Sequence, residues 1–353
     1  MCDGIALVPK LIFSFQNFIR KLESENCNMK KINWGIIGCG DVTELKSGPA
    51  FNKVPNSALV AVMRRDADKA ADYARRHNVP RWYNDANLLI NDPGVNAIYI
   101  ATPPSSHEQY TLAAINAGKP VYVEKPMALN YEAAKRMTNA AKEKNIKLVV
   151  AHYRREWPLF KKIKELINDN AIGKPILAEL EFFRPPLTKE ELAIEKNAWR
   201  VDPAISGGGL FHDLAPHQLD IMYWLFGPSK MITGIASNQN ELYTANDTVT
   251  GNILFESEIL FCGAWRFTAN ESKDHCEIIG SEGKLSFSFF SGNSIELNVN
   301  NTTTQFNFDA LQHVQQPMIE KVVQYFLDEA LNPCTGDEGA EIMRWMEGFV
   351  KGK

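Results

Sequence analysis

The sequence predicts an α/β fold: an N-terminal doubly wound parallel sheet, then a C-terminal α+β domain with an open, largely antiparallel sheet. Two observations lead to this class. Between residues 32 and 153, short β-rich segments alternate with helical ones, which is typical of βαβ units. After about residue 155, strand-like segments follow one another in succession, which favours antiparallel pairing.

The N-terminal elements can be placed individually. Strands are expected at 32–38, 58–63, 96–102, 120–126 and 147–153, and helices at 66–78, 106–118 and 130–145. The helical segments carry apolar residues at helical spacing and end in polar residues or glycine. Ser105 and Glu108 have the spacing of a capping box, and Gly118 stands where a glycine ends a helix.

The C-terminal elements follow a different order. A helix is expected at 158–170 and a strand at 176–184, and a glycine run then leads into an amphipathic helix ending near residue 226. Further strands are expected at 231–237, 248–256, 258–267, 275–280, 284–290 and 294–299, and two helices at about 316–331 and 337–350. Ser281-Glu282-Gly283 is typical of a tight turn between antiparallel strands.

Composition limits the kind of partner. The 353 residues carry a net charge of −4, so no overall basic field would attract nucleic acid or an anionic membrane. No apolar run approaches the roughly 20 residues that cross a bilayer. Six cysteines without a CxxC pair favour a reducing compartment. We therefore expect a cytoplasmic protein with a small-molecule partner, and neither nucleic acid nor membrane.

A glycine turn follows the first expected strand. In Gly38-Cys39-Gly40-Asp41-Val42, Gly38 permits a tight turn and Gly40 lets a pyrophosphate approach the N–H groups at the helix start. A bare turn is the alternative, but the βαβ series beginning on the same strand favours a dinucleotide. We assign residues 29–153 to a Rossmann dinucleotide-binding domain and 154–353 to a substrate and oligomerisation domain. Residues 1–28 are interpreted as an extension or a misassigned start.

The second strand ends in Arg64-Arg65, where an acidic residue would bind the adenosine ribose hydroxyls of NAD. Guanidinium groups pair with a 2′-phosphate through charge-assisted bonds. This favours NADP, with NAD possible; ordinary surface arginines are the alternative.

The chain resembles the glucose–fructose oxidoreductase / inositol dehydrogenase / rhizopine-catabolism (Gfo/Idh/MocA) oxidoreductase family over most of residues 31–350. The resemblance rests on "GIIGCGDV", "IATPPSSH", "VYVEKPMALN", "YRREWP" and "WRVDPAISGGGLFHDLAPHQLD". It implies a Rossmann domain, an open sheet often used for oligomer contacts, and hence a homo-oligomer, dimer or tetramer. It also implies cofactor contacts from Thr102, Pro103, His107 and Glu124, a catalytic Lys125 beside nicotinamide and substrate, and an Asp213/His217 pair.

Chemistry supports these roles. Hydride loss from an alcohol needs a base for the hydroxyl proton and positive charge near the developing alkoxide. Lys125 can supply the charge, and its pKa can fall if it is partly desolvated beside a cationic nicotinamide. His217 suits the general acid/base role and Asp213 an orienting role, since positions i and i+4 share a helix face. A surface lysine, a surface Asp/His pair or metal ligation are the alternatives; without an obvious third ligand, we expect no metal.

Further candidates for holding substrate or cofactor phosphate are Tyr153, Arg154 and Arg155 at the end of the last strand of the first sheet, and Trp199-Arg200 before the glycine run. Packing against aromatic residues is their alternative role. The sequence thus predicts an NAD(P)-dependent oxidoreductase, NADP-preferring, acting on a sugar, polyol or related carbonyl compound. A non-catalytic nucleotide-binding regulator and an NAD-dependent glycoside hydrolase of the same fold stay open.

Overall fold

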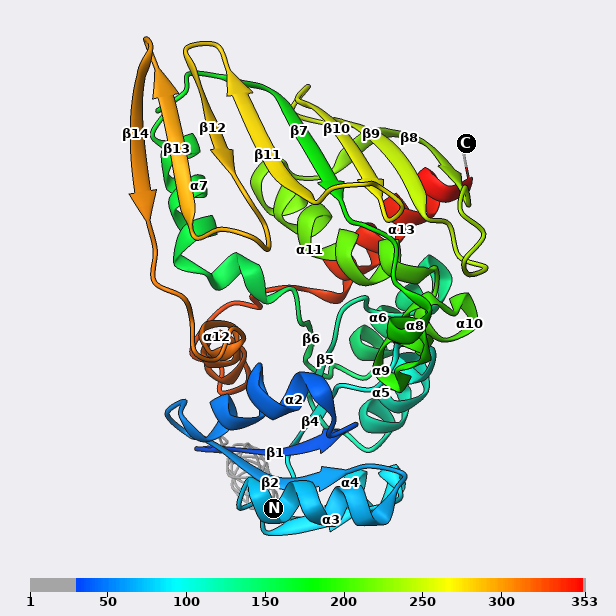
Figure 1. The fold of residues 1–353 in the computed structure, drawn as a ribbon. Helices are drawn as coiled ribbons and strands as arrows, with labels where there is room; N and C mark the ends of the chain where they lie inside the picture. Colours follow the sequence, from blue (N-terminus) through cyan, green and yellow to red (C-terminus); the bar gives the residue numbers. More distant parts are fainter. Residues whose placement is uncertain (1–29, 352–353) are drawn as a thin grey trace, which may run out of the picture.

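A computed structural model describes residues 30–351, apart from the side chain of Lys196. The predicted extension at residues 1–28 lies outside the described residues. The described chain contains two sheets, with helices packed around them (Figure 1). The predicted fold class is confirmed, because the first sheet is parallel and the second is mostly antiparallel.

The first sheet has six strands in the order β3-β2-β1-β4-β5-β6, all parallel. This is the order of a doubly wound dinucleotide-binding sheet, in which the direction of winding reverses between β1 and β4. The strands are β1 (Ile32–Ile37), β2 (Ser57–Met63), β3 (Arg81–Tyr83), β4 (Ala97–Ile100), β5 (Val121–Val123) and β6 (Leu148–Val150). Ligands bind beyond the carboxyl ends of such strands.

Helices and short helical turns connect these strands. They are α2 (Asp41–Leu45), η1 (Gly48–Asn52), α3 (Ala67–Arg76), α4 (Ala86–Ile90), η2 (Pro104–Ser106), α5 (His107–Asn116), α6 (Tyr131–Glu143) and η3 (Tyr153–Glu156). Gly118 follows α5 with a φ of +72°, as predicted for a helix-ending glycine. The predicted capping box of Ser105 and Glu108 is wrong. The residue that precedes α5 is Ser106, and its hydroxyl donates to Thr102 and Pro103 instead of capping the helix.

The second sheet has eight strands in the order β14-β13-β12-β11-β7-β10-β9-β8. They are β7 (Pro175–Phe183), β8 (Ser229–Ser237), β9 (Thr248–Phe255), β10 (Leu260–Arg266), β11 (Lys273–Gly280), β12 (Gly283–Phe287), β13 (Ser294–Val299) and β14 (Thr302–Asn307). Antiparallel pairing dominates, and within the described residues β7 and β10 form the one parallel pair of this sheet.

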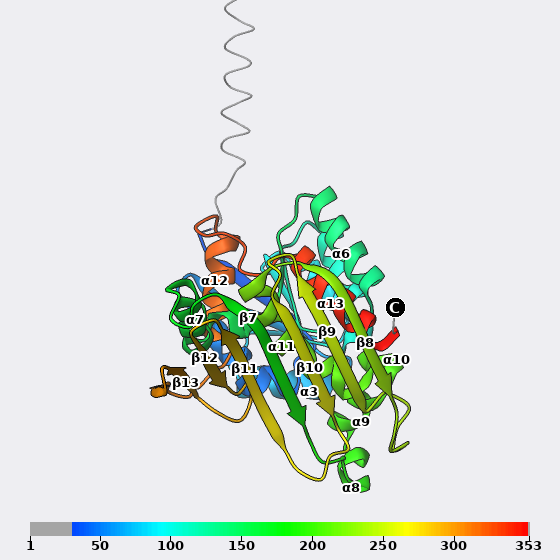
Figure 2. The same cartoon turned by 90° about the horizontal axis from the view of Figure 1, so that it is seen from above.

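The remaining helices lie mainly between the sheets. They are α7 (Pro158–Asn168), α8 (Lys189–Ala193), α9 (Glu195–Val201), α10 (Pro203–Ser206), α11 (Gly209–Phe226), α12 (Gln316–Phe326) and α13 (Gly336–Lys351). Helices α11 and α13 lie against one face of the second sheet, whose other face is open in the view from above (Figure 2). Helix α13 also packs against α6 and β6, so it connects the two sheets.

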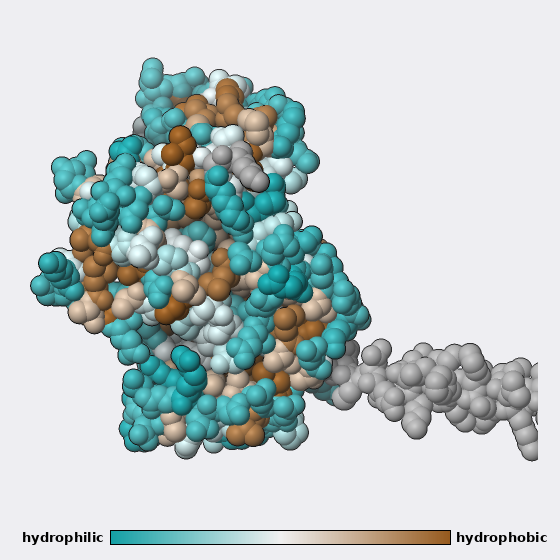
Figure 3. All heavy atoms as spheres, turned by 90° about the vertical axis from the view of Figure 1, so that its right-hand side faces the viewer, coloured by the Kyte–Doolittle hydropathy of each residue, from teal (hydrophilic) through white to brown (hydrophobic). Residues whose placement is uncertain are grey.

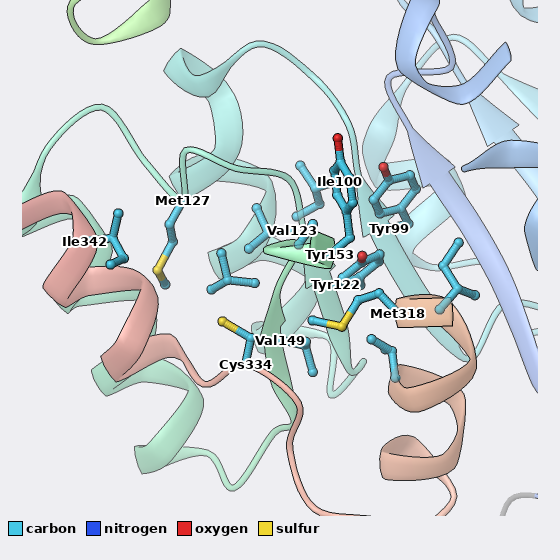
Figure 4. Packing of buried hydrophobic residues seen from close by; sticks show 14 of the residues in the cluster. Tyr99, Ile100, Tyr122, Val123, Met127, Val149, Tyr153, Met318, Cys334 and Ile342 are labelled. Carbon is cyan, nitrogen blue, oxygen red and sulfur yellow. The ribbon is translucent and has the colours of Figure 1, made fainter. Parts of the chain in front are cut away.

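The core of the first sheet is continuous with these helices. Tyr99 and Tyr122 stack on neighbouring strands with ring centroids 5.1 Å apart. Met318 of α12 and Ile342 of α13 approach the same strands from opposite sides (Figure 4). Removing this apolar surface from water stabilises the fold by about 25 cal/mol per Å² buried. The strand ends, and the loops that follow them, are therefore held on a rigid base.

Candidate functional site

The glycine turn brings the ends of β1 and β4 together. Gly38 has a φ of +94°, in the region that favours glycine. A Cβ on Gly38 would lie 2.7 Å from the backbone nitrogen of Thr102, which is closer than real Cβ atoms approach. Gly38 therefore lets two loops at the carboxyl edge of the sheet touch.

Gly40 has a different surrounding. A Cβ there would meet only the Gly38 oxygen, 3.9 Å away. The N–H groups of Asp41 and Val42 begin α2 just beyond, and the first N–H groups of a helix have no partner within it. This open cradle fits a dinucleotide pyrophosphate. Cys39 is buried, and burial raises its thiol pKa to about 12, so this thiol is protonated at neutral pH.

The two candidate arginines follow β2. Arg64 is half-buried and its Nη1 donates to the Cys39 carbonyl at 3.4 Å, whereas Arg65 is exposed. Arg64 thus reaches back toward the glycine turn. Asp66, next along the chain, caps α3 by accepting from the Lys69 N–H.

The loop after β4 is tied to the loop after β5 through His107. This side chain is fully buried; its Nε2 lies 2.7 Å from the Thr102 oxygen and its Nδ1 lies 3.0 Å from the Pro126 oxygen. The structure therefore places His107 between two loops, with both ring nitrogens directed at backbone. Thr102 and Pro103 stay at the edge of the glycine turn.

Glu124 is fixed from three directions. It is 5% exposed, and its Oε1 accepts hydrogen bonds from the Tyr99 hydroxyl and the Gln315 amide, both at 2.5 Å. Its Oε2 accepts from the backbone N–H of Lys125 at 3.1 Å. Its two oxygens are thus bonded within the protein, and the predicted direct contact to cofactor would have to compete with these bonds.

The side chain of Lys125 extends from the loop after β5 to α11. Its Nζ donates to Asp213 Oδ1 at 2.9 Å and to the Asp213 backbone oxygen at 2.8 Å. Arg200 Nε donates to the other oxygen of the same carboxylate at 3.2 Å. All three side chains are at least four-fifths buried, with exposures of 12%, 19% and 20% for Lys125, Asp213 and Arg200.

The charges of Lys125, Asp213 and Arg200 stabilise one another. Burial alone would lower the pKa of Lys125, but the carboxylates of Asp213 and Glu124 outweigh burial and raise it. Burial likewise opposes the charge of Asp213, while Lys125 and Arg200 lower its pKa below the usual value. Without a ligand, the two carboxylates therefore outweigh the desolvation of Lys125. The predicted fall of this pKa beside a cationic nicotinamide stays a prediction.

His217 lies one turn after Asp213 on α11. Its ring packs edge-on against Tyr153 and Phe290, at centroid distances of 5.2 and 5.6 Å. Burial lowers its pKa well below the ordinary value, and the charges of Lys125 and Arg154 lower it further. Its Nδ1 is buried without a hydrogen-bond partner. The predicted orientation of His217 by Asp213 is not found, because that carboxylate is bonded to Lys125 and Arg200.

The tandem arginines after β6 have separate surroundings. Arg154 is 5% exposed, and its guanidinium packs against the rings of Trp157 and Phe290, at 4.2 and 4.5 Å from their centroids. Arg155 instead forms a buried pair with Asp220, with Nη2 to Oδ1 at 2.7 Å and Nε to both carboxylate oxygens at 3.0 Å.

Arg155 and Asp220 position the site without belonging to it. Asp220 lies one turn after His217 on α11, and Arg155 also donates to Glu338 of α13 at 2.9 Å. The pair therefore clamps α11 and α13 to the end of β6. The sequence singles out Arg155 for substrate or phosphate but does not reveal its pair with Asp220, although Asp220 falls three residues after His217 on the same helix face.

Among the described residues, no group of three or more metal-ligating side chains is assembled. No helix within the described ranges is long and apolar enough to cross a membrane. Figure 3 shows a mainly hydrophilic surface with hydrophobic residues in small separate patches.

Two family models match the chain. Residues 32–152 match the oxidoreductase family with an NAD-binding Rossmann fold, and residues 160–286 match the GFO/IDH/MocA C-terminal domain. Together they cover more than half of the chain, including the glycine turn, Lys125, Asp213 and His217.

Curated proteins and solved structures agree with this match. The chain is 49% identical over 319 residues to Oxidoreductase P35 of Formosa agariphila, covering 90% of this chain and 98% of that protein. It is 28% identical over 256 residues to 1,5-anhydro-D-fructose reductase of Ensifer adhaerens, covering 71% and 74%. A levoglucosan dehydrogenase solved with NADH and levoglucosan has a TM-score of 0.80 at 20% identity, covering 91% and 96%.

Proposed function

Because the chain belongs to the GFO/IDH/MocA oxidoreductase family, we propose that it transfers hydride between a nicotinamide cofactor and a sugar, polyol or related small carbonyl compound. The observation that carries this proposal is the contact between Lys125 and Asp213. It brings a lysine at the carboxyl edge of the dinucleotide-binding sheet to the helix that bears His217.

The nicotinamide ring, when bound, accepts or donates the hydride. The residues of the chain handle the proton and the charge. The Lys125 ammonium, held in place by Asp213, donates a hydrogen bond to the reacting oxygen and stabilises negative charge developing there. This role requires a protonated lysine, and the two nearby carboxylates support that state.

His217 is assigned the proton transfer. Its lowered pKa keeps the imidazole neutral at neutral pH, so one nitrogen can accept the hydroxyl proton of an alcohol substrate. Because Nδ1 is enclosed without a partner, we assign this transfer to Nε2. In the reductive direction the same atom returns the proton to the product.

For the cofactor, we propose a preference for NADP over NAD. Arg64 reaches the glycine turn, and Arg65 follows it with an exposed side chain. Two guanidinium groups here would pair with a 2′-phosphate, with a charge-assisted bond strength of about 1.5 to 3 kcal/mol each. Arg64→Ala and Arg65→Ala should weaken binding of NADPH by about 10-fold or more while changing NADH binding little.

A single experiment separates the candidate functions. Purified protein is given NADPH or NADH with a panel of sugars, polyols and keto sugars, and cofactor absorbance is followed. Net oxidation or reduction of cofactor supports the proposal. Redox-neutral cleavage of a glycoside would instead favour the NAD-dependent hydrolase, and cofactor binding without any turnover would favour the regulator.

Two variants test the assigned residues. Lys125→Ala and His217→Ala should each lower kcat by about 100-fold or more, with cofactor affinity retained. Lys142 is an exposed lysine that forms a surface pair with Asp337, and it provides the matched control Lys142→Ala. Wild-type turnover in either site variant would remove that residue from the mechanism.

We also propose that the protein works in the cytoplasm as a homo-oligomer. Four cysteines of the described chain, Cys39, Cys262, Cys276 and Cys334, are free thiols, which suits a reducing compartment. The open face of the eight-stranded sheet supports assembly, and light scattering with size-exclusion chromatography would test it.

A further inference from the structure

Arg154 is a buried cation without a buried anion. Its side chain is 5% exposed, yet none of the carboxylates in residues 30–351 lies within ion-pair distance of it. Its recorded bond is from Nη1 to the Phe289 backbone oxygen, and its Nε is buried with no partner. Burial lowers the pKa of this guanidinium, but an arginine stays charged at any physiological pH.

One carboxylate acts on this charge but forms no ion pair with it. Asp274 is the carboxylate that acts on Arg154 over a longer distance. Its oxygens accept hydrogen bonds from the backbone N–H groups of Phe289, Phe290 and Ser291. Asp274 therefore stabilises the loop after β12, and Arg154 keeps donor capacity that the protein does not use.

Arg154 shares its surroundings with His217. The ring of Phe290 contacts both, at 4.5 Å from the guanidinium and 5.6 Å from the imidazole ring. The ring of Tyr153 lies 5.9 Å from the guanidinium and 5.2 Å from the imidazole. Arg154 therefore lies in the aromatic wall beside the proposed catalytic histidine.

The other two cations of the site have a partner within the protein. Lys125 and Arg200 share the carboxylate of Asp213, whereas Arg154 forms no ion pair among the described residues. Desolvating an unpaired charge is costly, so buried cations usually have an anionic partner. A partner absent from the protein itself can be supplied by a ligand.

We propose that Arg154 binds a carboxylate group of the substrate, so that the enzyme acts on acidic sugars, such as uronic or aldonic acids, in preference to neutral ones. This inference rests on the proposed function, because it uses the same substrate site. The rings of Trp157 and Phe290 both pack against the guanidinium, and a carboxylate would complete its unused hydrogen bonds.

The test compares matched pairs of neutral and acidic sugars, glucose with glucuronate and galactose with galacturonate. With the wild type, kcat/KM for the acidic member should exceed that for the neutral member by about 10- to 100-fold. Arg154→Gln should abolish this ratio, and Arg154→Lys should retain part of it. The matched control is Arg266→Gln, since Arg266 also lies over an aromatic ring, that of Phe183.

Binding is measured alongside turnover. The thermal midpoint of the cofactor-loaded protein is recorded with each sugar, after circular dichroism has shown that each variant is folded. A larger shift with the acidic sugars, lost in Arg154→Gln, supports the carboxylate site even if no sugar is turned over, in which case only the proposed function fails. Equal preference for neutral sugars, or an acid preference that survives Arg154→Gln, overturns the inference.

Discussion

Replacing Asp213 by asparagine tests the central contact of the site. The carboxylate lies 2.9 Å from Lys125 Nζ, and both side chains are more than four-fifths buried. At an effective dielectric constant of about 20, two unit charges at this separation interact by about 6 kcal/mol. Rearrangement and water entry recover part of this energy, so we expect a loss of about 2 to 3 kcal/mol in transition-state stabilisation, or about 30- to 150-fold in kcat.

The pH profile shows whether this loss acts through Lys125. In the wild type the pKa of Lys125 is raised, so the ammonium persists through the neutral range. Without Asp213, burial is opposed mainly by Glu124, so the pKa of Lys125 should fall. The alkaline limb of kcat should therefore move to lower pH when rates are recorded from about pH 6 to about pH 10.

The control is Asp337→Asn, which removes the carboxylate of an exposed pair with Lys142. Exposed pairs contribute little, so stability and kcat should stay near wild type. A kcat reduced in Asp213→Asn with an unmoved alkaline limb would show that Asp213 acts without setting the charge of Lys125. An unchanged kcat would refute its role altogether.

Three further predictions concern stability. Arg155→Leu leaves Asp220 buried without its partner and should lower the free energy of unfolding by about 3 to 5 kcal/mol in urea denaturation. His152 and His212 are buried with pKa values near 4 against 6.5, so the folded state holds them neutral. As the pH falls, these histidines take up protons in the unfolded chain before they do so in the folded protein. Each neutral histidine therefore contributes about 3 kcal/mol to the free energy of unfolding above about pH 6.5, and this contribution is lost as the pH falls toward about 4. Gly38→Ala should lower the thermal midpoint markedly because the new Cβ meets the Thr102 backbone.

Each of these has a paired variant. Gly40→Ala meets only one atom at 3.9 Å, so it should weaken cofactor binding with little change in stability; equal destabilisation by both glycine variants would contradict the assignment of Gly40 to the cofactor. His212→Gln should flatten the acid-side loss measured by denaturation, and an unaltered slope would assign that loss to other groups. Asp220→Asn keeps a hydrogen-bond acceptor for Arg155 and should cost less than Arg155→Leu.

Local signals account for the elements that the sequence predicts correctly. Strands β1, β4 and β5 are short, mainly apolar segments that alternate with helical ones, and this pattern predicts buried strands of a parallel sheet. The edge strand β14, Thr302–Asn307, has no such pattern because its side chains are mostly exposed. It pairs with β13 through a turn at Asn300-Asn301, so the signals for it are that turn and its three threonines rather than an apolar pattern.

Long-range pairing limits what the sequence says about the site. Lys125 and Asp213 were each identified through the family resemblance, but 88 residues separate them, and spacing cannot show which side chain an aspartate will meet. Helical periodicity placed Asp213 and His217 on one face and suggested that they interact. In the structure Asp213 binds Lys125 and Arg200, because two cations approach it from other elements. The domain boundary between residues 153 and 154 stays a prediction.

The Glu-Lys-Pro sequence after β5 now has a physical reason. Strand β5 is fully buried, so a lysine at its end would lose hydration without compensation. Glu124, which accepts hydrogen bonds from Tyr99 and Gln315, supplies one carboxylate that offsets this loss. Asp213 supplies the second from α11. Carboxylates after β5 and on α11 therefore act together to keep Lys125 protonated. Any movement that separates α11 from the edge of the first sheet would lower the pKa of the ammonium that hydride transfer needs.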